Sequence, residues 1–428
     1  DLPVRHQLER HGAIRVGSED ELRVIKQLFA IFGMYPVGYY DLRIVGFPLH
    51  ATAFRPISEE SLARNPFRIF TTVLRKDLVS PDTRVIAERI LEKRRLFTPR
   101  LLEIIDHAER DKSMTRQDAD DLIPEALKIF KWHPQSAVLM DDYLKLKEEH
   151  AMIADIACFP SAHINHLTPR TLDIDLVQEE MIKQGLPAKE KIEGPPKRQC
   201  PILLRQTSFR ALEEQVDFLS KSGATIRGTH TARFGEVEQR GAAVTRKGRD
   251  LYDHLLSRAV QDAASKAYSS SNFEDILSNT FSSYPDTWSE LRVRGLVYFR
   301  YRATPKGQLC ASEKSAESDR RVDIEHLLEL GLVECEPITY EDFLPLSAAG
   351  IFKSNLENEP EKPLFQGSES SLPELERALG CKIWNEFDVY EQLQQHSLRD
   401  CKKALRLDEI LMDYGSLSTM EAKLVLAS

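Results

Sequence analysis

The sequence lacks the features that mark several large classes of protein. No stretch approaches the roughly 20 consecutive apolar residues that cross a bilayer, so we expect no membrane span. Residues 1–10 are polar and unlike a secretory signal, although the absence of an initial methionine leaves room for a removed targeting segment. Basic residues do not outnumber acidic ones, and a net charge of −9 argues against a general role in binding nucleic acid or anionic membranes.

Familiar site motifs are also absent. The six cysteines are far apart and form no C-x-x-C pair, so we expect reduced thiols in a cytoplasmic protein and no cysteine-based zinc site. There is no P-loop, G-x-G-x-x-G, H-E-x-x-H, G-x-S-x-G or EF-hand loop. The commonest nucleotide, zinc-protease, serine-hydrolase and calcium sites are thereby excluded.

The residue pattern predicts an α+β protein in four segments. Residues 1–57 carry a helix (19–32, after Ser18) and strands (36–45 and 49–55) for a central sheet, residues 58–150 form a large helical insertion, and residues 246–428 are mainly helical. Residues 151–245 form a module with strands at 162–169, 191–193, 201–207 and 232–240 and helices at 173–184 and 209–221. That order is close to a β-α-β-β-β unit with one added helix.

Histidines within predicted strands are the first candidates for chemistry. We expect no special role for the eight in polar context, which are His6, His11, His107, His133, His150, His254, His326 and His396. The other four, which are His50, His163, His166 and His230, lie in or beside predicted strands next to small or hydroxyl residues. Each is a candidate metal ligand or an ordinary buried histidine. The spacing of His163 and His166 sends them to opposite faces of a regular strand.

Two carboxylates complete the candidate set. Glu236 and Glu238 are two apart on the predicted closing strand, so they share a face. A glutamate buried there is costly unless it is paired or ligated; the alternative is a solvated edge strand. Two histidines and one carboxylate on distant strands would form a facial triad that suits Fe(II), since three positions stay open for a chelating substrate and O₂.

Several stretches resemble known enzymes. Residues 165–174 resemble the opening strand of a vicinal-oxygen-chelate module, where His166 falls on the metal ligand. Residues 234–240 resemble the closing strand of hydroxyphenylpyruvate dioxygenase and hydroxymandelate synthase, where Glu236 falls on the ligand glutamate. More of the chain resembles the 2-oxoadipate dioxygenase/decarboxylase family, also called 2-hydroxyglutarate synthase. The matching stretches are residues 11–17, 38–42, 50–56, 65–68, 163–175, 202–209, 230–236 and 346–352.

The resemblance implies a fold, a reaction and a metal. The fold is a curved, vicinal-oxygen-chelate-like β-sheet with the helical insertion and a helical C-terminal region. The implied enzyme is a non-haem iron dioxygenase/decarboxylase that converts 2-oxoadipate and O₂ to 2-hydroxyglutarate and CO₂, a step of lysine catabolism. Its Fe(II) ligands fall on His50, His166 and Glu236. The helical insertion between the first two ligands is a departure from the tandem enzymes, and it leaves His230 as a rival to His50.

The same resemblance assigns residues to the substrate. The arginine that binds the distal carboxylate falls on Arg55, and a late loop that closes the pocket falls on Leu346 and Ser347, with Arg55 and Ser347 as the catalytic candidates. Gln206 is a further candidate pocket residue. Because Arg55 is an odd number of residues from His50, a bend near Pro56 is needed for both to face one pocket.

Two alternatives stay open. One is another vicinal-oxygen-chelate metalloenzyme that acts on a different 2-oxo acid, because a fold does not fix function. An aromatic 2-oxo acid would need an apolar pocket in place of Arg55. The other is a non-catalytic, metal-stabilised scaffold, which predicts an incomplete triad or a fourth protein ligand. The sequence does not fix the oligomeric state.

Overall fold

A computed structural model describes residues 4–189, 192–231, 233–265, 270–313, 321–344 and 371–412. The chain divides into two compact units. Unit 1 comprises Asp1–Glu193, Arg205–Gln239 and Asp342–Asn385, and unit 2 comprises Gly194–Leu204, Arg240–Glu341 and Glu386–Ser428. Among the residues described, no helix is long and apolar enough to span a membrane.

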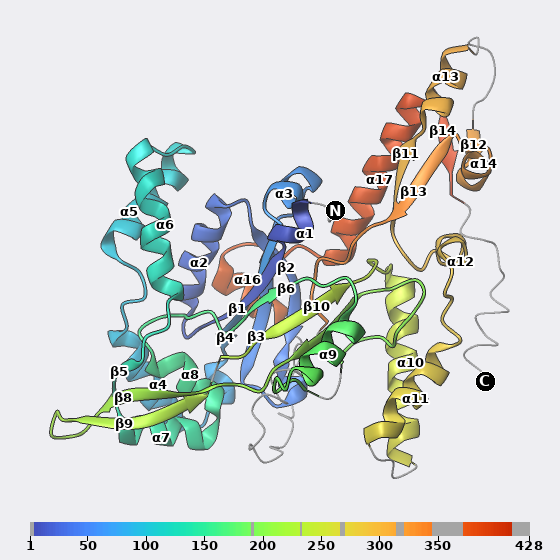
Figure 1. Ribbon diagram of the computed structural model, residues 1–428. Coiled ribbons are helices and arrows are strands. Elements are labelled where there is room, and N and C mark those ends of the chain that lie inside the picture. The colour runs from blue at the N-terminus through green and yellow to red at the C-terminus, as the bar shows by residue number, and fades with distance from the viewer. Residues whose placement is uncertain are drawn as a thin grey trace. The chain divides into compact units, whose positions relative to one another are not determined.

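Unit 1 is built on a mixed five-stranded sheet (Figure 1). Its strands are β1 (Arg10–Val16), β2 (Tyr35–Asp41), β3 (Leu49–Arg55), β4 (Phe67–Leu74) and β6 (Leu167–Pro169). They lie in the order β2-β3-β4-β1-β6, and only the β1–β4 pair is parallel. The predicted strand at 49–55 is β3, and the predicted helix over 19–32 is α2 (Glu19–Ile31), capped by the Ser18 side chain. The predicted strand at 36–45 is too long, because β2 ends at Asp41 and the next residues form the 3₁₀ helix η1 (Leu42–Val45).

The register of the strands fixes which side chains share a face. Ala13 pairs with Phe70, and Phe70 pairs with Ala53, so these three lie in one row across β1, β4 and β3. Because side chains alternate along a strand, His11 lies on the same side as Ala13. We call this side the His11 face. Phe54 directly follows Ala53 on β3, so its side chain points to the other side of the sheet, which we call the Phe54 face.

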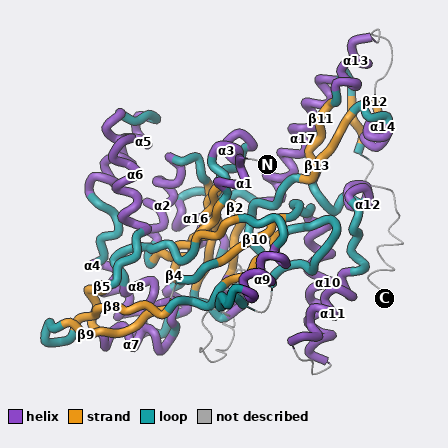
Figure 2. Tube along the Cα trace, in the orientation of Figure 1, coloured by secondary structure: helices purple, strands orange, loops and turns teal. Residues whose placement is uncertain are grey.

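Helices cover both faces of the sheet, as the colouring of Figure 2 makes easy to follow. The His11 face packs against apolar residues of α4 (Pro81–Lys93), α7 (Met140–Glu149) and α8 (Ala151–Cys158). The Phe54 face packs against α2 and against α5 (Pro99–Asp111), α6 (Arg116–Phe130) and α16 (Leu372–Leu379). The central strands are therefore buried on both sides, with apolar layers above and below.

The range 58–150 is not a purely helical insertion. Besides α4 to α7 it contains α3 (Glu59–Arg64), the 3₁₀ helix η2 (Lys76–Leu78) and two strands. One of them, β4, is central to the sheet, and the other is β5 (Gln135–Leu139). Seven of the eight residues of β4 are buried, so its sequence lacks the alternation that marks a half-exposed strand.

The predicted helix over 209–221 is wrong. The chain forms β8 (Glu213–Leu219) there, which pairs antiparallel with β9 (Thr225–Thr231) and parallel with β5. Val216 and Phe218 are buried on one side of β8, a period of two that the charged residues around them obscure. The predicted helix over 173–184 is confirmed as α9 (Ile174–Lys183). The same stretch of the chain also contains β7 (Leu204–Ser208) and β10 (Glu236–Arg240). A short helix, α1 (Val4–Leu8), precedes β1.

Unit 2 is mainly helical with two small sheets. Its helices are α10 (Arg246–Ser265), α11 (Ser270–Phe281), α12 (Trp288–Val293), α13 (Pro305–Glu313), α14 (Ile324–Glu329) and α17 (Glu386–Ala404). Its strands are β11 (Phe299–Ala303), β12 (Arg321–Asp323), β13 (Val333–Pro337) and β14 (Glu409–Leu411), paired as β11-β13 and β12-β14. The chain is thus an α+β protein with mixed sheets and many helices, as predicted.

Candidate metal centre

Three buried side chains from distant parts of unit 1 meet at one end of the His11 face. His11 is the second residue of β1, His166 immediately precedes β6, and Glu236 begins β10. Pairing of β1 with β6 sets His11 opposite Thr168, two residues after His166. The Phe234 amide donates to the Asn165 carbonyl, at 3.1 Å, which holds the start of β10 beside His166.

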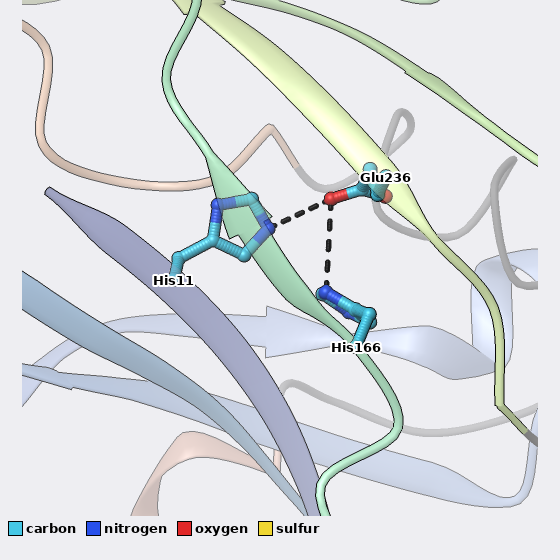
Figure 3. A group of neighbouring side chains, drawn as sticks. All are labelled: His11, His166 and Glu236. Atoms are coloured by element: carbon cyan, nitrogen blue, oxygen red, sulfur yellow. Dashed lines mark hydrogen bonds and ion pairs between the residues drawn. The ribbon is translucent and has the colours of Figure 1, made fainter. Parts of the chain in front are cut away.

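Figure 3 shows these three side chains converging. Glu236 Oε1 lies 2.8 Å from His11 Nε2 and 3.8 Å from His166 Nδ1. One ligand atom of each residue lies within 4.8 Å of the others, and no other such group of histidine, cysteine or acidic residues occurs in the described ranges. Two imidazole nitrogens and one carboxylate, without a fourth member, form a donor set that can hold a divalent metal and leave coordination positions open.

The group is strongly coupled electrostatically. Burial by itself lowers the pKa of His11, but the charges and hydrogen bonds of Glu238 and Glu236 outweigh it, so the pKa is raised. Burial lowers the pKa of His166 to about 4, and the positive charges of His11 and Arg15 act in the same direction. Burial by itself raises the pKa of Glu236, but His166 and His11 outweigh it, so this carboxylate stays ionised. A divalent cation between these groups would meet an anionic oxygen and a neutral imidazole already in place.

Polar neighbours hold the group in position. The Thr168 hydroxyl donates to Glu236 Oε1 at 2.9 Å and lies 2.9 Å from His166 Nδ1. On the other side, Glu238 Oε2 lies 2.8 Å from His11 Nδ1. All of these residues are buried, so water has little access to the ligands.

His50 does not belong to this group. It lies on β3 at an even spacing from Phe54, so it points to the Phe54 face, opposite His11. The β3–β4 register runs without a bulge from Leu49 to Phe54, so nothing turns His50 back. Its ring contacts Tyr39, at 6.3 Å between centroids. The structure therefore brings His166 and Glu236 together with His11, and not with the predicted His50.

The surroundings of His50 predict acid sensitivity. Burial lowers its pKa to about 4, and the positive charge of Arg75 acts in the same direction. In the unfolded chain His50 has the ordinary histidine pKa of about 6.5. Between that pH and about pH 4, His50 binds a proton in the unfolded chain but not in the folded protein, so the free energy of unfolding falls as the pH falls. We expect His50→Gln to flatten the pH dependence of the urea-unfolding free energy by up to about 1.4 kcal/mol per pH unit in this window. An unchanged slope would contradict the assignment of this acid sensitivity to His50.

Comparisons with known proteins identify the family. The profile of the 2-oxoadipate dioxygenase/decarboxylase family matches residues 2–355. The chain belongs to this family. It is 47% identical to the 2-oxoadipate dioxygenase/decarboxylase of Pseudomonas putida over 402 residues, which cover 93% of this chain and 85% of that protein. It is 48% identical to the Escherichia coli protein of the same name, covering 94% and 87%.

A solved structure agrees with the family assignment. The hydroxyglutarate synthase of Pseudomonas putida, determined in complex with 2-oxoadipate, superposes with a TM-score of 0.81 at 43% identity. The match covers 93% of this chain and 86% of that one. Both units of the chain therefore fall largely within the family fold.

His11 is the residue that sequence reasoning missed. The resemblance to the 2-oxoadipate dioxygenase/decarboxylase family included residues 11–17, yet the histidine was grouped with those in polar context because Arg5 to Arg10 are mostly polar. The sequence after His11 nevertheless has the composition of a buried strand. The residues after His11 are Gly-Ala-Ile-Arg-Val-Gly, which mix small and β-branched types as a buried strand does. Every residue of β1 after Arg10 is buried.

The rival ligand His230 lies in a different buried cluster. His230 Nε2 is 2.8 Å from Asp155 Oδ1, and the Tyr143 hydroxyl lies 3.1 Å from His230 Nδ1. His163 Nε2 approaches the same Asp155 oxygen at 3.4 Å, and Arg15 binds the other oxygen at 2.5 Å. Burial by itself raises the pKa of Asp155, but the charge of Arg15 and the interactions with His163 and His230 outweigh it and hold the pKa well below its usual range. His163 and His166 thus belong to different clusters, although neither lies on a strand: the predicted strand over 162–169 is reduced to β6 (Leu167–Pro169).

Arg55 is engaged by the protein itself. Its Nε and Nη2 donate to the two oxygens of Asp342, at 2.7 and 2.8 Å, and Nη1 donates to the Pro56 carbonyl. Arg55 shares a side with Ala53, which is the His11 face, so it and His50 are on opposite faces. Both members of the ion pair are buried. A substrate carboxylate would have to displace Asp342 to bind Arg55.

The other predicted pocket residues are Gln206, Leu346 and Ser347. Gln206 is buried on β7, where its backbone exchanges hydrogen bonds with that of Glu193 at 2.8 and 2.9 Å. Within the part of the chain that the structure describes, Gln206 makes no hydrogen bond to the three ligands. Leu346 and Ser347 lie outside the described residues.

Proposed function

We propose that this chain converts 2-oxoadipate and O₂ to 2-hydroxyglutarate and CO₂, with Fe(II) held by His11, His166 and Glu236. The observation that carries the proposal is the buried group of two histidines and one glutamate, within 4.8 Å of one another. It occurs in a chain nearly half identical, over more than nine-tenths of its length, to proteins named for that activity. His11 replaces His50, which the family resemblance had suggested as the first ligand.

The donor set suits iron(II). Imidazole and carboxylate ligands together are typical of non-haem iron, whereas a structural zinc site would have four protein ligands. When bound, the iron supplies open positions at which the 2-oxo carboxylate and O₂ meet. The protein's part is to orient the ligands through Thr168 and Glu238, to exclude water by burial, and to hold the far end of the substrate. No general base is required from the chain.

We propose Arg15, in place of Arg55, as the cation for the distal carboxylate. Arg15 is four residues from His11 on β1, so both side chains lie on the His11 face, with Cα atoms about 13 Å apart along an extended strand. Its charge acts on the pKa of His166, which puts it in electrostatic reach of the ligands. Its Nη1 also pairs with the buried Asp155, at 2.5 Å, which helps to fix Arg15 on this face. Planar guanidinium donors suit a carboxylate.

Removing Arg15 tests the recognition of the second carboxylate. We expect Arg15→Ala to lower kcat/KM for 2-oxoadipate by about 10- to 100-fold, because one charge-assisted contact contributes roughly 1.5–3 kcal/mol. Arg15→Lys recovers only part, since an ammonium lacks the two-pronged geometry. Turnover of 2-oxohexanoate, which has no distal carboxylate, is the matched control and should change little. An equal loss on both substrates would refute the role.

An oxygen electrode and product analysis test the reaction. We expect O₂ uptake with 2-oxoadipate that depends on added Fe(II), with one CO₂ and one 2-hydroxyglutarate formed per O₂. Shorter 2-oxo diacids should react poorly, because metal and arginine fix both ends of the ligand. A preference for hydroxyphenylpyruvate would favour another vicinal-oxygen-chelate metalloenzyme. Metal binding without uptake on any 2-oxo acid would favour a non-catalytic scaffold.

The finer features of the fold and setting belong to the same proposal. We keep the vicinal-oxygen-chelate description, because His166 and Glu236 lie at the first and last strands of a strand–helix–strand segment. Ser347 and Leu346 stay candidate pocket residues on the family resemblance alone. All six cysteines are free, which fits the proposed cytoplasmic location.

A further inference from the structure

Glu238 occupies an unusual position beside the proposed ligands. It lies two residues after Glu236 on β10, so both carboxylates project to the same side of the strand. Its side chain is fully buried. Glu238 Oε2 lies 2.8 Å from His11 Nδ1, while Glu236 Oε1 lies 2.8 Å from His11 Nε2. The His11 ring is thus held between two carboxylates, one at each nitrogen.

We infer that Glu238 is a positioning residue that orients His11 for the metal. This inference rests on the proposed function, since it assumes a metal at His11, His166 and Glu236. Glu238 accepts the Nδ1–H of His11, so a bound metal would displace the proton of Nε2 and take the lone pair at that nitrogen. Nε2 is also the nitrogen that faces Glu236. A carboxylate behind a ligating histidine fixes the ring and makes it a stronger donor.

Arg68 binds Glu238 and holds its carboxylate beside His11. Arg68 Nη2 donates to Glu238 Oε2 at 2.6 Å, and both residues are buried. The Arg68 guanidinium lies 4.3 Å from the centre of the Phe343 ring, and the His11 ring contacts the same phenylalanine at 5.0 Å. Phe343 is itself fixed, because its amide donates to the Tyr40 hydroxyl at 3.2 Å. The arginine therefore holds Glu238 against Nδ1, and the phenylalanine packs against both the arginine and the His11 ring.

The two histidines are supported differently. His166 Nδ1 has the neutral Thr168 hydroxyl at 2.9 Å, whereas His11 Nδ1 has an anionic carboxylate. Because the Thr168 hydroxyl gives its one hydrogen to Glu236, it accepts from His166 Nδ1–H, whereas His11 Nδ1 meets an ionised carboxylate, which is a stronger acceptor. The charged support among the two histidines is therefore at His11.

Cobalt binding tests the inference without relying on activity. Co²⁺ alone is titrated into metal-free protein and followed by its visible absorption, with a competing chelator to set the affinity. We expect Glu238→Gln to weaken Co²⁺ binding by about 10- to 100-fold while the absorption of the bound ion still develops. The matched control is Glu341→Gln, which changes a buried carboxylate paired with Arg240 at 2.7 Å and should leave the affinity unchanged.

A second variant separates orientation from stability. Arg68→Met with Glu238→Gln removes the buried charge pair as a unit, so no arginine is left without its anion. We expect this double variant to unfold near the temperature of the intact protein and still to bind Co²⁺ about 10- to 100-fold more weakly. Unchanged affinity in Glu238→Gln or in the double variant overturns the inference. Loss of all binding, as in a ligand variant, also overturns it, because Glu238 would then be a ligand. An intact protein that binds no Co²⁺ overturns the proposed metal site as well.

Discussion

His11→Ala is expected to abolish both metal binding and turnover, whereas His50→Ala keeps both. The reason is geometric: His11 Nε2 faces Glu236 Oε1 at 2.8 Å, and His50 lies on the opposite side of the sheet. With one of three ligands gone, the remaining two hold a divalent ion weakly in competition with water. His166→Ala and Glu236→Ala should match His11→Ala. Metal content after dialysis against excess Fe(II) and oxygen uptake with 2-oxoadipate measure the result.

His230→Ala completes the comparison. Its partner Asp155 lies in a cluster separate from the three ligands, so the variant should retain metal even if it loses stability. Retention of full metal by His11→Ala, or loss of metal by His50→Ala in a folded protein, would refute the ligand assignment. Circular dichroism of each metal-free variant establishes that the sheet is intact.

Arg55→Ala is expected to destabilise the protein by about 3–5 kcal/mol, the usual cost of removing one member of a buried ion pair. Asp342 has no exposed side-chain surface, and both of its oxygens accept from Arg55 at 2.7 and 2.8 Å. The free energy of urea unfolding of the metal-free protein measures the loss. If Arg55 instead bound the substrate, the variant would keep its stability and lose about one to two orders of magnitude in kcat/KM for 2-oxoadipate.

Two controls separate these outcomes. Arg55→Met combined with Asp342→Leu replaces the buried pair by apolar side chains and should recover most of the lost stability. Arg64→Ala removes an arginine from an ion pair with Glu60 in which both side chains are largely exposed, and should change stability little. A stable Arg55→Ala protein would contradict a structural role for the Arg55–Asp342 ion pair.

Local sequence patterns predicted much of unit 1. Ser18 followed by apolar residues at helical spacing predicted α2, and aromatic and β-branched runs predicted β2 and β3. The pattern failed at β8, where charged residues around Val216 and Phe218 resemble a helix surface. That strand is specified by its pairing with β9 and β5, which a local window does not contain.

The candidate site was predictable in part for a similar reason. His166 and Glu236 lie in motifs whose residue order is recognisable. His11 and His50 both precede small residues in strand-like text, so local sequence does not separate them. The separation comes from the register: His11 pairs with Arg68, and His50 pairs with Val73, which places them on opposite faces of the same sheet. Arg55 faces the correct side, but its partner Asp342 is 287 residues away along the chain.

The proposed metal centre can form only late in the synthesis of the protein, because its three ligands come from distant parts of the chain. His11 and Glu236 are 225 residues apart, and β1, which carries His11, lies between β4 and β6 in the sheet. A growing chain therefore has no complete ligand set until β10 has left the ribosome and β1 is already flanked on both sides. A metal bound at the proposed site would link β1, an early strand, to β10, which follows much later in the chain. By mass action, such binding would oppose the release of β1, so the metal-loaded protein should unfold at a higher temperature than the metal-free protein.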